Sequence, residues 1–147
     1  MERTFKIIYT SDTHGHIFPV NYAAGCGESS GLLNLAAQID KNGNTLVLDG
    51  GDSLQGTPLV QYYLAHADEF PHHPVAEAFN AMGCDYFTLG NHDFNFGYDA
   101  LRAYLCAMDG VCLCANVQDL GGALPLLPET VHTLKNGLRI GITGIVT

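Results

Sequence analysis

The residues with the clearest potential for chemistry are an aspartate and a histidine two positions apart, in the string Asp12-Thr13-His14-Gly15-His16. Residues i and i+2 of an extended segment project to the same side, so we expect the Asp12 carboxylate and the His14 imidazole to bind one ion. A mixed oxygen and nitrogen donor pair suits Mn²⁺, Fe or Zn²⁺ better than Ca²⁺. Taken alone, the pair has a second interpretation, an aspartate that caps its loop beside a solvated histidine.

A second cluster combines two carboxylates with two glycines in the string Asp49-Gly50-Gly51-Asp52. The glycines allow the backbone to pass close to an ion, while Asp52 turns inward. A carboxylate has two oxygens, so Asp52 could bridge two cations that lie about 3.5 to 4 Å apart. By itself, Gly-Gly-Asp is also a common turn. No Gly-Lys-Ser or Gly-Lys-Thr follows, which excludes a phosphate-binding P-loop.

The third cluster, Gly90-Asn91-His92-Asp93, is the most specific of the three. Adjacent side chains diverge on an extended or turning backbone, so Asn91 could offer its carbonyl oxygen to a metal while His92 faces a substrate. The alternative for His92 is a surface histidine that is hydrogen-bonded within its own loop.

Each cluster follows directly after a stretch with the composition of a β-strand. The predicted strands, of which we expect the first to be buried, cover residues 4–11, 45–48, 86–89 and 111–115. Apolar residues at helical spacing, with proline in two of the first turns, predict helices over residues 32–39, 58–66, 74–82 and 98–108. Asn136-Gly137 is a strong hairpin signal between the apolar runs 130–134 and 138–145.

This alternation of strands and helices predicts an α/β fold with a mainly parallel sheet flanked by helices. In open sheets of this kind, ligands bind outside the carboxyl ends of the strands. We therefore expect the three clusters to converge on one crevice.

Composition narrows the classes of partner. Six Lys and Arg residues against fifteen Asp and Glu residues give a formal charge of −9, which argues against binding a nucleic acid polymer. No apolar run approaches the roughly 20 residues of a membrane span, so no membrane contact is expected. The five cysteines are odd in number and fit reduced thiols. With no signal-peptide pattern at the start, we expect a cytoplasmic setting, or an exported or cell-surface one if a longer gene product carries such a signal.

In their order along the chain, the three clusters resemble the calcineurin-like metallophosphoesterases. The strings Gly51-Asp52-Ser53-Leu54-Gln55-Gly56 and Gly90-Asn91-His92-Asp93-Phe94-Asn95 resemble the branch of 5′-nucleotidases and 2′,3′-cyclic-nucleotide 2′-phosphodiesterases, and tilt the expected substrate toward cyclic and 3′-nucleotides. The resemblance covers nearly all of residues 1–147. It implies that they form the N-terminal portion of the αββα metallophosphoesterase sandwich, without its C-terminal part or a nucleotide-binding domain.

The resemblance also implies roles for particular residues. Asp12 and His14 would hold the first metal, Asp52 would bridge both, and Asn91 would hold the second. His92 would be the catalytic histidine, and Asn91 and His92 would contact the substrate. The implied cofactors are two divalent ions, Mn²⁺ or Zn²⁺ first, with Fe, Co²⁺ or Mg²⁺ as alternatives. The implied substrate is a small nucleotide or another phosphate ester, hydrolysed with His92 stabilising or protonating the leaving oxygen.

Two departures from the family pattern qualify this expectation. Exported nucleotidases place an aspartate three residues after the catalytic histidine, whereas this chain has Asn95, which we group with His92 as a catalytic residue able to hydrogen-bond the imidazole. The downstream histidine ligands and the Gly-His-x-His segment are absent from the sequence. We therefore expect weak metal binding, an inactive isolated chain and self-association through exposed apolar surface. The alternative is a degenerate, non-catalytic module that binds metal or nucleotide.

Other reactive residues receive simpler interpretations. His132 is expected to be a partly buried strand residue, and His66, His72 and His73 to be solvated histidines at helix ends. Cys112 and Cys114 alternate along a strand and are expected to pack in the core. Neither Ser11 nor Ser53 lies in a Gly-x-Ser-x-Gly elbow, which disfavours a serine hydrolase.

Overall fold

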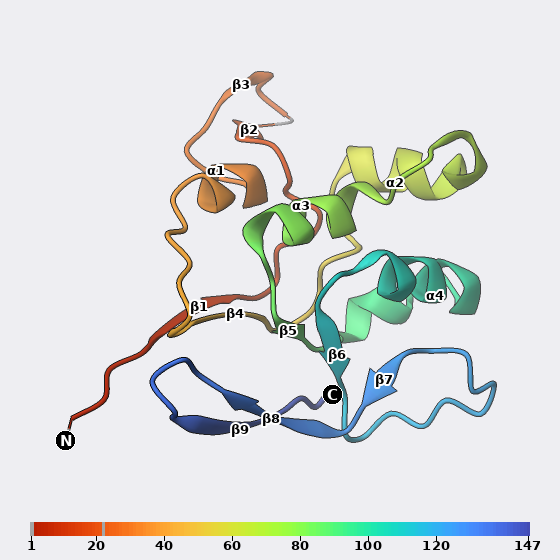
Figure 1. Cartoon of the computed structure of the whole chain (residues 1–147). Helices are drawn as coiled ribbons and strands as arrows, with labels where there is room; N and C mark the ends of the chain where they lie inside the picture. The colour runs from red at the N-terminus through yellow and green to blue at the C-terminus, as the bar shows by residue number, and fades with distance from the viewer. Residues whose placement is uncertain (1, 22) are drawn as a thin grey trace.

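The computed structural model describes residues 2–21 and 23–147, which are built around one five-stranded sheet (Figure 1). All neighbouring strands in this sheet are parallel. In spatial order the strands are β1 (Lys6–Thr10), β4 (Thr45–Asp49), β5 (Tyr86–Phe87), β6 (Val111–Leu113) and β7 (Leu126–Leu127). The predicted parallel sheet is confirmed, and β7, which is two residues long, extends it.

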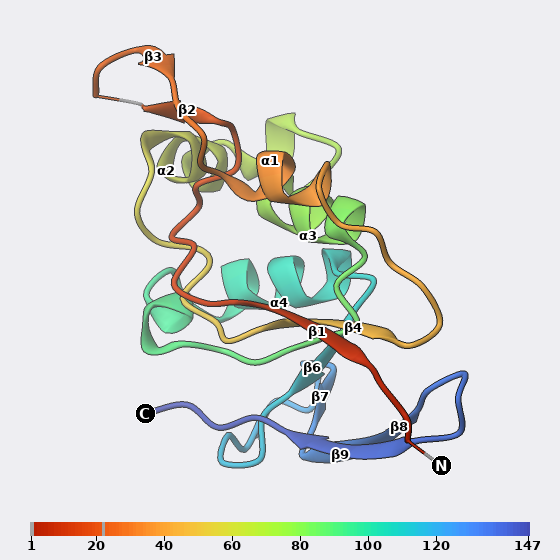
Figure 2. The same cartoon turned by 90° about the vertical axis from the view of Figure 1, so that its left-hand side faces the viewer.

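Four α-helices cover one face of the sheet, as Figures 1 and 2 show. They are α1 (Leu32–Ala36), α2 (Pro58–Ala65), α3 (Pro74–Met82) and α4 (Tyr98–Ala107). The Thr57 hydroxyl caps α2 by accepting the Val60 N–H, and proline lies in the first turn of both α2 and α3. α1 ends earlier than the predicted residue 39, because the N–H groups of Gln38 and Ile39 donate to carbonyls three residues back instead of four.

The core lies between the helices and the sheet, with α3 at its centre. Val75 and Phe79 of α3 are fully buried and belong to the same apolar cluster as Val47 of β4. Cys112 and Cys114 are buried as expected, although the intervening Leu113 is buried too. Strand β6 is therefore covered on both faces, as the central strands of a layered α/β sheet are.

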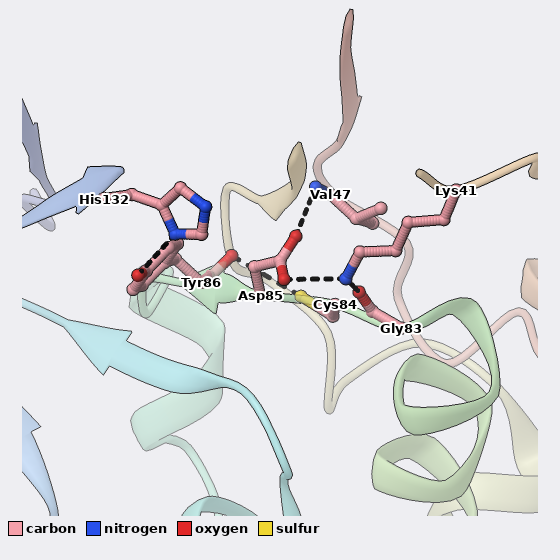
Figure 3. A network of polar contacts seen from close by, with 7 residues as sticks. All are labelled: Lys41, Val47, Gly83, Cys84, Asp85, Tyr86 and His132. Carbon is pink, nitrogen blue, oxygen red and sulfur yellow. Dashed lines mark hydrogen bonds and ion pairs between the residues drawn. The ribbon is translucent and has the colours of Figure 1, made fainter. Parts of the chain in front are cut away.

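A hairpin of β8 (Glu129–Thr133) and β9 (Arg139–Thr143) lies on the opposite face of the sheet from the helices (Figures 1 and 2). Gly137 turns it with a φ of 79°, which confirms the hairpin predicted from Asn136-Gly137. His132 is half-buried, and its Nδ1 lies 3.0 Å from the Tyr86 hydroxyl, which ties the hairpin to β5 (Figure 3).

Strand β1 corrects one prediction, because it is not buried. Ile7 is 48% exposed and Tyr9 is 64% exposed on the face away from the helices, whereas Ile8 packs against the core. Within the described residues, β1 is an edge strand that pairs with β4 alone, and the hairpin leaves these two side chains exposed. A run of apolar residues cannot distinguish a central strand from an edge strand, since that depends on which other strands flank it.

Several short elements leave no periodic pattern and were not predicted. They are the ribbon of β2 (Val20–Asn21) and β3 (Cys26–Gly27), and two 3-10 helices, Ala67–Glu69 and Asn91–Phe94. The second of these gives a turning backbone around His92, one of the two possibilities expected there. In the described ranges, no helix has the length and apolar character needed to cross a membrane.

Candidate metal centre

The loops that follow β1 and β4 bring together three potential metal ligands. Donor atoms of Asp12, His14 and Asp52 all lie within 4.8 Å of one another. Two carboxylates and one imidazole form a donor set of the kind that Mn²⁺, Fe or Zn²⁺ accepts. The convergence expected at the carboxyl edge of the sheet is therefore present for these three residues.

The backbone that presents these ligands is left-handed rather than extended. Asp12, His14 and Asp52 have φ angles of 53°, 48° and 59°, and among the described residues they are the only non-glycine residues with positive φ. The reasoning from extended geometry was therefore wrong, although the pair does converge. This conformation costs a non-glycine residue about 1–2 kcal/mol. Strain at three neighbouring positions is typical of a backbone shaped for a site.

Bonds between the two loops hold this conformation. The Asp12 N–H donates to the Gly51 carbonyl and the His14 N–H donates to the Asp52 carbonyl, each at 2.9 Å. Gly51 also approaches the third loop so closely that a Cβ there would lie 2.2 Å from the Gly90 nitrogen. Glycine is therefore required sterically at position 51, and its φ of 92° is one that glycine adopts without strain.

His14 is oriented by a backbone carbonyl. Its Nδ1 lies 2.7 Å from the Gln55 carbonyl oxygen. A carbonyl only accepts hydrogen bonds, so Nδ1 carries the proton and Nε2 of the neutral ring keeps its lone pair. That lone pair can coordinate a metal, which is the usual arrangement for a ligating histidine.

Asp93, the last residue of the third cluster, is a buried structural carboxylate at 1% exposure. Its two oxygens accept backbone N–H groups at 2.8–2.9 Å from Asp52, Ser53 and Leu54 in one loop and from Gly90 in its own. Burial raises the pKa of the Asp93 carboxyl, and the four N–H donors oppose that rise. This carboxylate fixes the loop that carries Asp52 to the turn that carries His92.

A second buried carboxylate, Asp49 at the end of β4, also holds the loop that carries Asp52. It accepts from the Thr10 hydroxyl at 2.6 Å, the Gly51 N–H at 2.9 Å and the Ser53 hydroxyl at 3.2 Å. Burial raises the pKa of Asp49 to about 6, although these three donors lower it.

His92 lies beside these potential metal ligands. Its backbone N–H donates to Asp52 Oδ1 at 2.8 Å, and its ring centroid is 5.7 Å from that of His14. Its Nδ1 lies 2.8 Å from Gln55 Oε1 and 3.0 Å from Asn95 Nδ2. Asn91 precedes it in the same 3-10 helix, with its side chain exposed. The predicted catalytic group is therefore assembled next to the carboxylates.

Gln55 is the contact residue that the sequence interpretation did not assign. It touches both histidines and also accepts from Asn95 Nδ2. Its one sequence signal was its place three residues after Asp52 in the glycine-bounded string. Spacing alone could not indicate that its side chain reaches the loop after β5.

His73 corrects a further prediction, because it is buried rather than solvated. It is 4% exposed, its Nδ1 accepts from the Ala76 N–H at the start of α3, and burial lowers its pKa to about 4. Its neighbours are the rings of Tyr63 and Tyr104, which explains its burial by packing between helices. His72 is exposed, as expected.

Comparisons with known proteins agree with this geometry. The model of the calcineurin-like phosphoesterase family matches residues 5–143, so the chain belongs to that family. It is 32% identical to the trifunctional nucleotide phosphoesterase protein YfkN of Bacillus subtilis, over 96% of this chain and 11% of that protein. It is 31% identical to a 2′,3′-cyclic-nucleotide 2′-phosphodiesterase/3′-nucleotidase of Salmonella typhimurium, over 96% of this chain and 24% of that one.

Among solved structures, the chain is similar to the crystal structure of the calcineurin-like phosphoesterase YfkN from Bacillus subtilis. The TM-score is 0.79 at 32% identity, covering 95% of this chain and 47% of that one. The α/β architecture of a calcineurin-like phosphoesterase is thus confirmed. The chain spans between about a tenth and a quarter of the length of these two curated relatives.

Proposed function

We propose that this chain forms part of a metal-dependent phosphoester hydrolase that acts on nucleotides, with 2′,3′-cyclic and 3′-nucleotides as the preferred class. The observation that carries the proposal is the convergence of Asp12, His14 and Asp52 within 4.8 Å, beside His92. The nucleotide class is supported by the names of the two curated relatives.

In this proposal, Asp12, His14 and Asp52 would hold one divalent ion, and Asp52 and Asn91 would hold a second. Mn²⁺ and Zn²⁺ fit these oxygen and nitrogen donors best. When bound, the ions supply positive charge that attracts a phosphate and stabilises charge on its oxygens. Water would form the new bond to phosphorus as the bond to the leaving oxygen breaks. His92, protonated on Nε2, would contact the phosphate and give that proton to the leaving oxygen, and Asn95 would support this histidine.

The test measures Mn²⁺-dependent hydrolysis of 2′,3′-cyclic AMP and of a simple aryl phosphodiester. It uses this chain and a longer gene product that contains it, each with and without His92→Ala. We expect the longer product to be active and the variant to lose at least about 100-fold in kcat. The isolated chain is expected to be inactive. Absence of hydrolysis by the longer product on every phosphoester would leave the degenerate binding module as the better assignment.

The exposed side chains of β1 also support the predicted self-association. Ile7 and Tyr9 of β1, and Phe5 just before it, are each more than two-fifths exposed. We propose that two copies of the isolated chain associate through this surface, since a free strand edge with apolar side chains favours pairing. Sedimentation velocity over a range of concentrations, repeated with Ile7→Lys, tests this. A wild-type chain that stays monomeric at the highest concentration contradicts it.

The five cysteines are free thiols. This state is the one that a reducing compartment maintains, and it supports the cytoplasmic setting that we propose. Localisation of the tagged gene product tests it, and export to the cell surface would contradict it.

A further inference from the structure

Gln55 lies between the two histidines of the site and contacts each with a different part of the residue. The ring centroids of His14 and His92 are 5.7 Å apart, and the ring planes are inclined at 64°. The Gln55 backbone oxygen faces His14 Nδ1, and its side-chain oxygen faces His92 Nδ1. We propose that Gln55 is a positioning residue that fixes the orientation and the tautomer of both rings; the consequence for catalysis rests on the proposed function.

The side-chain contact is a small polar cluster with one acceptor and two donors. Gln55 Oε1 lies 2.8 Å from His92 Nδ1 and also accepts from Asn95 Nδ2, and Asn95 Nδ2 itself lies 3.0 Å from His92 Nδ1. An amide oxygen has two lone pairs, so it can accept from both groups at once. In this arrangement the neutral His92 ring carries its proton on Nδ1 and keeps a lone pair on Nε2. Under the proposed function, Nε2 is the nitrogen that takes up a second proton and gives it to the leaving oxygen.

In this cluster, Asn95 positions the side chain of Gln55. The sequence places Asn95 where exported nucleotidases have the aspartate that orients the histidine. Here the acceptor for the imidazole comes from Gln55, and Asn95 holds that acceptor in place by donating to it. An amide oxygen orients the ring without adding negative charge beside the metal-binding carboxylates Asp12 and Asp52. A carboxylate in that position would repel them.

The experiment determines the tautomers of His14 and His92 by NMR of the ¹⁵N-labelled 147-residue chain, without metal, at mildly alkaline pH where imidazoles are neutral. We expect both rings to carry the proton on Nδ1. In Gln55→Leu, which keeps the backbone carbonyl and a similar volume, His92 should become a mixture of tautomers. His14 should not change, because its acceptor is the backbone, and it therefore serves as an internal control.

Two further variants sharpen the result. Gln55→Glu restores an acceptor oxygen and should restore the Nδ1 tautomer of His92. Asn95→Ala removes the donor to Gln55 Oε1 and the 3.0 Å contact of Asn95 Nδ2 with His92 Nδ1, but it leaves the acceptor oxygen of Gln55. It should therefore change the His92 tautomer less than Gln55→Leu does. The proposal is overturned if His92 carries its proton on Nε2 in the wild-type chain, or if Gln55→Leu leaves its spectrum unchanged. A larger effect of Asn95→Ala would transfer the role to Asn95.

In a gene product that hydrolyses phosphoesters, Gln55→Leu should lower kcat about tenfold and leave KM within about twofold, because it affects the orientation of His92 rather than substrate binding. The tautomer measurement needs no turnover. A product without hydrolytic activity would therefore reject the proposed function, while the NMR result would still decide the role of Gln55.

Discussion

Two aspartates join segments of backbone at opposite ends of the parallel strands. One organises the candidate site, and the other stabilises regular secondary structure. Asp93, at the carboxyl edge, accepts four backbone N–H groups from two loops. Asp85, at the start of β5, accepts one backbone N–H, from Val47 at 2.9 Å, and the Lys41 ammonium at 2.6 Å (Figure 3). Lys41 also donates to the Gly83 carbonyl, which closes the end of α3.

The two edges differ in the backbone that each carboxylate holds. Asp85 and Lys41 join a regular strand to the ordinary left-handed glycine that ends a helix. Asp93 holds Asp52 in a left-handed conformation and places its side chain near those of Asp12 and His14. A charge placed in regular structure stabilises it, whereas a charge that binds several N–H groups of irregular loops can also organise a site.

The largest expected effect comes from Asp93→Asn. The amide brings a donor against backbone N–H groups and leaves several of them poorly paired, which should lower the free energy of unfolding by about 3 kcal/mol. Mn²⁺ affinity of the chain, measured by calorimetry, should fall at least about tenfold. Asp85→Asn is the matched control and should leave Mn²⁺ affinity unchanged. Equal losses of affinity in both variants would remove the distinction between the edges.

If Asp93→Asn fails to fold, hydrogen exchange of the wild-type chain gives the same information. The amides of Ser53 and Leu54 should be protected without metal, because each donates to Asp93 at 2.9 Å or less. Exchange at the rate of an open loop would show that Asp93 does not preorganise this segment.

The next largest effect concerns pH and Asp49. The pKa of this buried carboxyl is raised from 3.8 to about 6 by desolvation, so the folded chain binds a proton that the unfolded chain has released. Its contribution is present below pH 4 and is lost as pH rises through about 6, a change of about 3 kcal/mol. In Asp49→Asn this component disappears. The difference in unfolding free energy, wild type minus variant, should therefore fall between pH 4 and pH 7. A difference independent of pH would contradict the buried, proton-binding carboxyl.

Tyr86→Phe, at the start of β5 and away from the candidate site, should have a smaller effect. It removes the hydrogen bond to His132 at 3.0 Å and keeps the ring, so the unfolding free energy should fall by about 1 kcal/mol. Mn²⁺ affinity should not change. Denaturant unfolding and the same metal titration check both statements, and a metal effect from this site would mean that the hairpin is coupled to the centre.

The smallest effect is expected for Lys41→Met. The Lys41 and Asp85 side chains are 34% and 21% exposed, so solvent screens the pair and its loss should cost about 1 kcal/mol or less. High salt should reduce the difference between wild type and variant further. A salt-independent loss would point instead to the hydrogen bond with the Gly83 carbonyl.

The sequence by itself determined the order of the main elements and the three clusters at strand ends. Apolar runs, capping residues and Asn136-Gly137 act through residues close in sequence, so their patterns can be recognised from the sequence alone. It did not determine that β1 lies at an edge, or that His73 is buried, because both depend on which segments pack alongside them. The left-handed backbone at Asp12 and Asp52 could not be predicted either, because hydrogen bonds from the other loops hold it.

Only the tertiary structure showed which residues hold the side chains of the candidate site in place. Gln55, Asp49 and Asp93 act on residues 37 to 41 positions away or on loops from other strands. No local spacing rule encodes such contacts, because they exist only once the parallel strands bring their carboxyl ends to one edge. The sequence thus identified the residues that could hold a metal, and the fold identified the residues that hold them in place.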